Sequence, residues 1–335
     1  MKNSFKIWKT IQIMVWLVGI AILFCLLFYP TIGIHLLWNI LIPIAPALLV
    51  VATGLWRNIC PIASTALFPR HINISRQFKL TSKQQALLGF IAVLLLYFIV
   101  PLRHTLFNVN GIATAILLIS LGCVALIMGS LFDWKSGWCS SLCPIHPVEK
   151  FYGTTPMLTL KNEHCTACVK CTVPCPDTTP NIYLFSDNKF SYQKMGTFLL
   201  IGGFPGFIWG WFHVADYEGT ITLQNLAAAY KMPILGILVT VALFYIGTTV
   251  LKNKKKQVLI RVYAAMAVSC YYWFRLPSLF GVGLFKGDGM LVDLSVYLAE
   301  NTMIGITITT SIFFFWWIVF KKQIKTSWLS RPNYA

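Results

Sequence analysis

The sequence predicts an all-α integral membrane protein with about eight transmembrane helices, and three observations carry this prediction. Of the 335 residues, 57% are hydrophobic and only 11% are charged. The apolar residues lie in runs long enough to cross a bilayer, which takes about 20 residues per helix. Tryptophan, tyrosine and phenylalanine make up 15% of the chain, as is typical of aromatic belts at membrane interfaces. A water-soluble domain could not hydrate so apolar a surface.

Eight apolar runs follow one another, with short polar links between most of them. The predicted spans are 11–29, 33–55, 86–103, 111–132, 196–214, 232–251, 258–280 and 301–320. The seventh span is interrupted by two charges, Arg261 and Arg275. The fifth contains a glycine- and proline-rich stretch, 202–211. This stretch either breaks the helix and lines a cavity, or lets helices pack closely through small residues.

Positive charge is distributed unequally between the two sides of the predicted membrane. With the amino terminus inside, the inner segments and the inner end of the seventh span hold 23 of the 27 Lys and Arg residues. Membrane proteins retain basic residues on the cytoplasmic side. We therefore expect a multi-pass protein of the inner (cytoplasmic) membrane, with both termini and the long loops 56–85 and 133–195 in the cytoplasm. The formal charge of +17 reflects this retention, and nucleic acid is not an expected partner.

The second long loop carries a cysteine pattern that is specific for iron–sulfur chemistry. The run C-x2-C-x2-C-x3-C-P, typical of bacterial ferredoxins, is formed by Cys165, Cys168, Cys171, Cys175 and Pro176. A zinc site is the weaker alternative, because zinc favours two separated cysteine pairs. We expect a small ferredoxin-like iron–sulfur loop domain over 133–195 on the cytoplasmic side. It would separate two repeated helical pairs over 1–132 from a second four-helix half over 196–335.

An internal repeat links the two long loops. The segment that ends in Cys60 matches the segment that ends in Cys143, and each cysteine precedes a proline and follows a helical pair. In the second copy Cys139 lies four residues before Cys143. In the first copy, Trp56 stands at the position where the repeat predicts this cysteine.

Spacing assigns the seven loop cysteines to one or two [4Fe–4S] clusters, because the fourth cysteine of the run binds the other cluster in two-cluster ferredoxins. The first cluster would be held by Cys143, Cys165, Cys168 and Cys171, and the second by Cys60, Cys139 and Cys175. The second set lacks a fourth cysteine. Either a non-cysteine ligand or an open iron completes it, or the second cluster is absent or a three-iron species. The candidate non-cysteine ligands are His146, His71, His164 and Asp133.

This combination of a multi-span chain, a Cys-Pro loop, a C-x3-C-P segment and a ferredoxin run resembles the NapH/NosR-type membrane polyferredoxins, to which CcoG-type copper-oxidase assembly proteins are related. The resemblance covers about residues 1–195. It implies cytoplasmic clusters that exchange electrons with quinol or with a partner redox protein.

Three function classes remain open at this point. The chain could transfer electrons between the quinone pool or a cytoplasmic donor and a partner redox protein. It could instead reduce a metal such as copper, or a cofactor, during assembly. It could also be a membrane anchor subunit of a larger respiratory complex.

Three histidines, His35, His104 and His213, are expected near the outer ends of their spans. A histidine in a membrane protein is a functional candidate, and these could ligate a haem or hydrogen-bond a quinone carbonyl. The alternative is that each lies at the interface with its polar edge in water. No pair has a spacing within one helix that specifies a haem, and we predict no catalytic residue.

Overall fold

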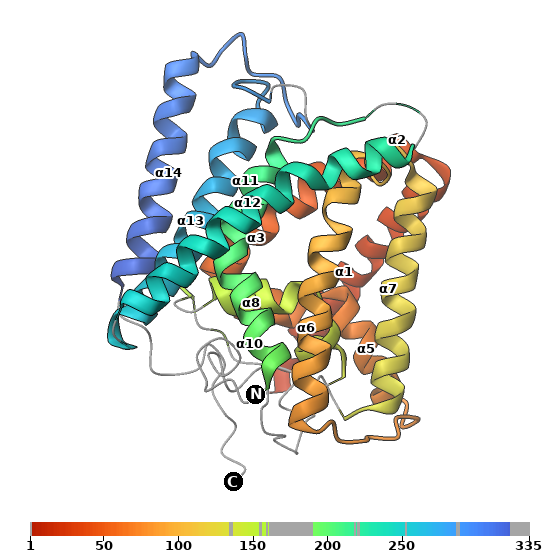
Figure 1. The fold of residues 1–335 in the computed structure, drawn as a ribbon. Coiled ribbons are helices and arrows are strands. Elements are labelled where there is room, and N and C mark those ends of the chain that lie inside the picture. Colours follow the sequence, from red (N-terminus) through yellow and green to blue (C-terminus); the bar gives the residue numbers. More distant parts are fainter. Residues whose placement is uncertain are drawn as a thin grey trace.

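The computed structural model is a bundle of helices (Figure 1). It describes residues 2–133, 137–153, 156–158, 160, 190–217, 219, 222–251, 253–285 and 289–321. The ferredoxin run at 165–176 lies outside these ranges. Regular structure in the described part is helical, apart from an isolated β-bridge between Phe78 and Phe132. The all-α fold is confirmed for this part of the chain, whereas a ferredoxin-like domain is not among its elements.

The first four predicted spans form helices close to the expected bounds. Helix α1 covers Lys2–Phe28, and the second span consists of α2 (Pro30–Ile34), the π-helical segment η1 (His35–Leu41) and α3 (Ile42–Val51). Helix α6 (Ser82–Ile99) continues into the 3-10 turn η2 (Pro101–His104), and α7 covers Gly111–Leu131. Thr81 and Gln84 form a capping box that starts α6, which satisfies backbone donors that a helix end would otherwise leave open.

Both loops that carry a Cys-Pro pair contain helices of their own. Helices α4 (Thr53–Ile59) and α5 (Pro61–His71) follow the second span. A π-helical turn, η4 (Trp138–Leu142), and helix α8 (Ile145–Tyr152) follow the fourth. The residues of α8 from His146 to Tyr152 are all buried. Figure 1 shows α8 inside the lower half of the bundle.

The second half of the chain is built around helix α11, the last part of the fifth span. The fifth span consists of α10 (Ser191–Thr197), the π-helical segment η6 (Phe198–Gly202) and α11 (Gly203–Phe212). Helices α12 (Leu223–Val250), α13 (Asn253–Leu279) and α14 (Glu300–Phe320) follow. In α11 every residue except Trp209 is buried. By contrast, only 17% of the apolar stretch of α12 and 11% of that of α1 are buried.

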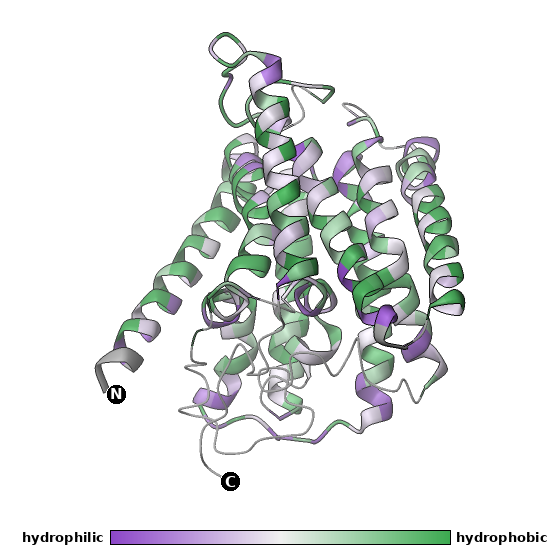
Figure 2. Cartoon of the chain, turned by 90° about the vertical axis from the view of Figure 1, so that its left-hand side faces the viewer, coloured by the Kyte–Doolittle hydropathy of each residue, from purple (hydrophilic) through white to green (hydrophobic). Residues whose placement is uncertain are grey.

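Among the described residues, seven helical segments are long and apolar enough to cross a membrane, which confirms a multi-pass membrane protein by length and composition. Figure 2 shows hydrophobic residues along α1, which slants away from the other helices, and hydrophilic residues gathered at the helix ends. The remaining predicted span, α13, is 27 residues long but carries Arg261, Arg275 and several lysines. It runs beside α14 in Figure 1, and at 1.5 Å per residue it is about 40 Å long.

The glycine-rich stretch of the fifth span packs closely against α12. A Cβ atom built on Gly206 would lie 2.0 Å from the carbonyl oxygen of Gly236, and one built on Gly210 would lie 2.3 Å from that of Met232. The two backbones therefore touch, and α11 continues unbroken through this contact. Close packing through small residues is thus the alternative that the structure adopts, not a broken helix.

One core joins the two halves of the chain. Its buried residues come from α3, α6, α8, η6 and α14, among other elements, and include Leu49, Val93, Phe151, Leu200 and Phe314. Phe151 of α8 is fully buried in it. This core therefore positions α8, and with α8 the second Cys-Pro pair.

Candidate metal centre at the two Cys-Pro junctions

The first Cys-Pro junction lies between α4 and α5. Cys60 has φ −58° and ψ 118°, and Pro61 is the first residue of α5. Steric contact with a proline ring drives the preceding residue out of the helical region, while proline itself suits the first helical position. Cys60 therefore ends one helix directly before Pro61 begins the next, which holds its thiol at the corner between them.

The second junction repeats this backbone geometry. Cys143 has φ −64° and ψ 120°, follows η4 and precedes Pro144 at the start of α8. Its two angles agree with those of Cys60 to within a few degrees. The internal repeat predicted from the sequence is therefore present in the backbone conformation of the two junctions.

Hydrogen bonds align the two copies differently from the sequence comparison. The N–H group of Cys60 donates to the carbonyl of Trp56, four residues back, and that of Cys143 donates to the carbonyl of Trp138, five residues back, both at 3.0 Å. Trp56 thus corresponds to Trp138. The π-helical turn accommodates the one additional residue of the second copy. The interpretation that Trp56 stands in place of a cysteine is corrected accordingly.

The structure brings the three described loop cysteines into one region. Cys139 and Cys143 both pack on a small core formed by α5, α7 and η4. Burial, and then the nearby charge of Cys60, raise the pKa of the Cys143 thiol to about 12. The backbone N–H groups of Ile145 and His146 donate to the Cys143 sulfur and oppose this rise. Neighbouring thiolates repel each other, and a bound cation would stabilise them, but these described cysteines are by themselves only part of the donor set that a metal centre needs.

The other predicted ligands are not assembled around these thiols in the described part of the chain. Cys165, Cys168, Cys171, Cys175 and His164 lie outside the described residues. Within the described ranges, no group of three or more His, Cys, Asp or Glu side chains is arranged to hold a metal ion. Asp133 pairs with Arg70 at 3.2 Å, and His71 is exposed. A cluster at the junctions would need donors from the ferredoxin run.

A buried ionic network, which sequence reasoning missed, lies beside the second junction. Arg57 of α4 donates through Nε to Oε1 of Glu149 and through Nη2 to Nδ1 of His146, the latter at 2.9 Å. All three side chains are almost fully buried. Glu149 itself could have indicated this network, because it is one of only ten acidic residues in the chain. A charged side chain buried in a membrane protein needs a partner of opposite charge.

The network sets the charge state of its members. Burial by itself would raise the pKa of Glu149, but the charge of Arg57 and its hydrogen bond bring it below its ordinary value. Burial, reinforced by the charge of Arg57, lowers the pKa of His146 to about 4. At neutral pH His146 is therefore an uncharged ring that accepts the Arg57 hydrogen bond, and Arg57 and Glu149 form the ion pair.

The three histidines expected near the outer ends of the spans each have a separate partner. Asp216 holds Nδ1 of the fully buried His104, whose Nε2 has no hydrogen-bond partner among the described residues. Nδ1 of His35 contacts the side-chain amide of Asn39 at 3.0 Å. The ring of His213 is hydrogen-bonded to the carbonyl of Trp209 at 2.7 Å. His104 is therefore buried, not placed with its polar edge in water.

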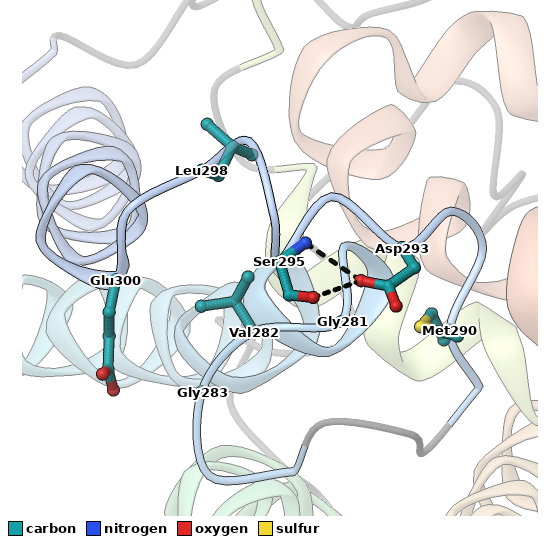
Figure 3. A pocket seen from close by; sticks show the side chains of 8 residues that line it. All are labelled: Gly281, Val282, Gly283, Met290, Asp293, Ser295, Leu298 and Glu300. Atoms are coloured by element: carbon teal, nitrogen blue, oxygen red, sulfur yellow. Dashed lines mark hydrogen bonds between the residues drawn. The ribbon is translucent and has the colours of Figure 1, made fainter.

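A pocket of about 470 Å³ lies in the loop between α13 and α14, at the opposite end of the bundle from the junctions (Figures 1 and 3). Two of its lining residues are acidic, Asp293 and Glu300. The Asp293 carboxylate accepts hydrogen bonds from the backbone N–H and the hydroxyl of Ser295, at 2.9 and 2.6 Å (Figure 3). The carboxylate thus stabilises the turn of the loop.

Searches of protein-family models, curated proteins and solved structures each found no match to this chain.

Proposed function

We propose that the chain is a membrane-bound electron-transfer protein that holds one or two [4Fe–4S] clusters at its Cys-Pro junctions. It would link the quinone pool or a cytoplasmic donor to a partner redox protein. When bound, a [4Fe–4S] cluster supplies one-electron transfer, while the protein supplies its position and its electrostatic surroundings. Cys143, Cys165, Cys168 and Cys171 would hold the first cluster, and Cys60, Cys139 and Cys175 would contribute to the second.

The observation that carries the proposal is the pairing of a complete ferredoxin run with two equivalent Cys-Pro corners. Cys60 and Cys143 occupy the two corners, Cys139 lies four residues before Cys143, and the run that contains four more cysteines begins 22 residues after Cys143. In the described part, hydrogen bonding by backbone N–H groups at the start of α8 counters part of the effect by which burial raises the pKa of the Cys143 thiol. Such donors stabilise the thiolate form, which is the form that ligates iron.

The proposal places the junctions at the cytoplasmic surface. Basic residues concentrate in the segments on that side of the predicted topology. The same topology requires α13 to be an eighth crossing. Without it, α14 would start on the inner side of the membrane, whereas the predicted topology has both α12 and α14 run from the outer to the inner side. The charges of α13 then sit near the ends of the helix or among neighbouring helices instead of facing lipid.

Iron and sulfide analysis of the purified chain, with redox-poised electron paramagnetic resonance, tests the proposal. We expect a [4Fe–4S] signal, with about eight irons per chain for two clusters or about four for one. Cys168→Ala should abolish the first cluster, because one of its thiolates is lost. Cys123→Ala is the matched control, since Cys123 is exposed on α7 and belongs to neither predicted set. Unchanged iron content and spectrum in Cys168→Ala would refute the assignment.

A further inference from the structure

We propose that the buried network of Arg57, Glu149 and His146 is a positioning and charge-setting device for the metal centre at Cys143. It ties the two Cys-Pro junctions together, and the carboxylate of Glu149 opposes negative charge at the centre. The charge-setting part rests on the proposed function, whereas the positioning part can be measured without any cluster.

The network is placed to couple the two copies of the repeat. Arg57 lies three residues before Cys60, and His146 lies three residues after Cys143, with Glu149 one helical turn further along α8. The bonds from Arg57 to the other two side chains therefore cross from the first copy to the second. His146 also donates its backbone N–H to the carbonyl of Cys143 at 3.1 Å. The position of one cysteine is thereby linked to that of the other.

Because the network is buried, solvent and salt screen its charges only weakly, so these charges act strongly on neighbouring groups. The Arg57 and Glu149 side chains are 3% and 6% exposed, so solvent and salt reduce their fields less than at a surface. Cys143 lies within reach of Glu149, whose negative charge disfavours a thiolate there. A reduced cluster carries one more negative charge than an oxidised one. With a cluster bound at Cys143, Glu149 would make its reduction harder and Arg57 would make it easier.

Reduction potentials of two variants separate this charge effect from a loss of structure. In Glu149→Gln the arginine keeps its charge, because guanidinium does not deprotonate in proteins, so the network gains one positive charge and the potential should rise. In the double variant Arg57→Gln/Glu149→Gln both charges are absent, and the potential should return toward that of the wild type. Glu300→Gln, at the opposite end of the bundle, should leave the potential unchanged.

The pattern across variants decides the charge-setting part. If the substitutions acted by disrupting the packing, the reduction potential of the double variant would differ from that of the wild type at least as much as that of Glu149→Gln does. A potential that fails to rise in Glu149→Gln, or that does not return in the double variant while iron content stays at the wild-type level, overturns the charge-setting role. If the wild-type chain holds no iron, the proposed function and this part of the inference fail together.

Cross-linking of Cys60 to Cys143 tests the positioning part in iron-free protein. In a variant of the full chain in which the other eight cysteines are serine, a short bifunctional thiol reagent should join the two residues. Arg57→Gln should lower the yield by half or more, and Arg57→Lys should restore part of it. Equal yields with and without Arg57 would overturn the positioning role whether or not a cluster exists.

Discussion

At the scale of single residues, the junctions depend on charges that are buried and matched. Removing a carboxylate or a guanidinium from water costs several kcal/mol, and a partner with good geometry must offset this. Arg57 and Glu149 supply each other with that partner, and the neutral ring of His146 accepts a second hydrogen bond from Arg57. A second cation at His146 would share the single carboxylate of Glu149 with Arg57, in a buried place. The network therefore favours the uncharged form of the ring.

Stability should fall as the pH drops from about 6.5 toward 4, because of His146. Its pKa is 6.5 in the unfolded chain and about 4 in the fold. Below 6.5 the unfolded chain takes up the proton first, so protonation favours unfolding. Because each tenfold difference in proton affinity corresponds to about 1.4 kcal/mol, the full loss is on the order of 3 kcal/mol. Denaturant unfolding of iron-free protein in detergent, followed across this pH range, measures it.

Two histidine variants provide the comparison for this pH dependence. His146→Gln removes the titrating group while keeping an acceptor for Arg57, so the slope between pH 6.5 and 4 should flatten. His213→Gln removes an exposed histidine and should leave the slope as it is. An unchanged slope in His146→Gln would show that another group is responsible.

At the scale of elements, the backbone contact between α11 and α12 holds the second half of the chain together. The apolar environment of a bilayer gives helices no hydrophobic reason to associate, so contact between backbones becomes the main source of attraction. Gly206 and Gly236 permit that contact because neither has a side chain. Any Cβ atom at these positions would overlap a carbonyl group.

Gly206→Ala should therefore destabilise the protein by about 1–3 kcal/mol, the usual cost of overpacking. The substitution would otherwise stabilise a helix by up to about 1 kcal/mol, because alanine restricts the unfolded chain more than glycine does. Gly305→Ala on α14 is the matched control, since a Cβ atom there would meet nothing within 4 Å. Thermal unfolding in detergent should show a loss for the first variant and no loss for the second.

At the scale of the whole molecule, the amino-terminal end of α1 and the carboxyl-terminal end of α14 lie at the same end of the bundle (Figure 1). Seven crossings alone would put these ends on opposite sides of a membrane. The charged helix α13 resolves the mismatch if it crosses as well. Its arginines have partners inside the protein: Arg275, for example, donates to Asn39 at 3.1 Å and to the carbonyl of Trp38 at 3.2 Å.

Labelling of intact cells with a membrane-impermeant maleimide tests this topology. Ser295→Cys, in the loop after α13, should gain label over the wild type in intact cells, because eight crossings put that loop outside. Gln77→Cys, in the loop after α5, should gain label only after the cells are opened. Label on Ser295→Cys that also requires opened cells would show that α13 does not cross.

Particular residues show how far the candidate site could be predicted. Pro61 and Pro144 mark the two junctions in the sequence, because proline limits its own conformation and that of the residue before it. The equivalence of Trp56 and Trp138 could not be predicted, since a π-helical turn shifts the register by one residue without any change in composition. The Arg57–Glu149 pair joins residues that are 92 positions apart, so no local pattern indicates it.

The membrane class, the approximate positions of the membrane-spanning helices and the uneven distribution of charge could be read from the sequence, because all three follow from local hydrophobicity and local charge. The sequence also determined the cysteine spacing on which the iron–sulfur proposal rests. Three features emerge from the packing: the fifth span packs through its glycines, His104 is buried against Asp216, and α8 brings Glu149 to Arg57. These features depend on which helices meet and in what register, and that is a property of the packed chain as a whole.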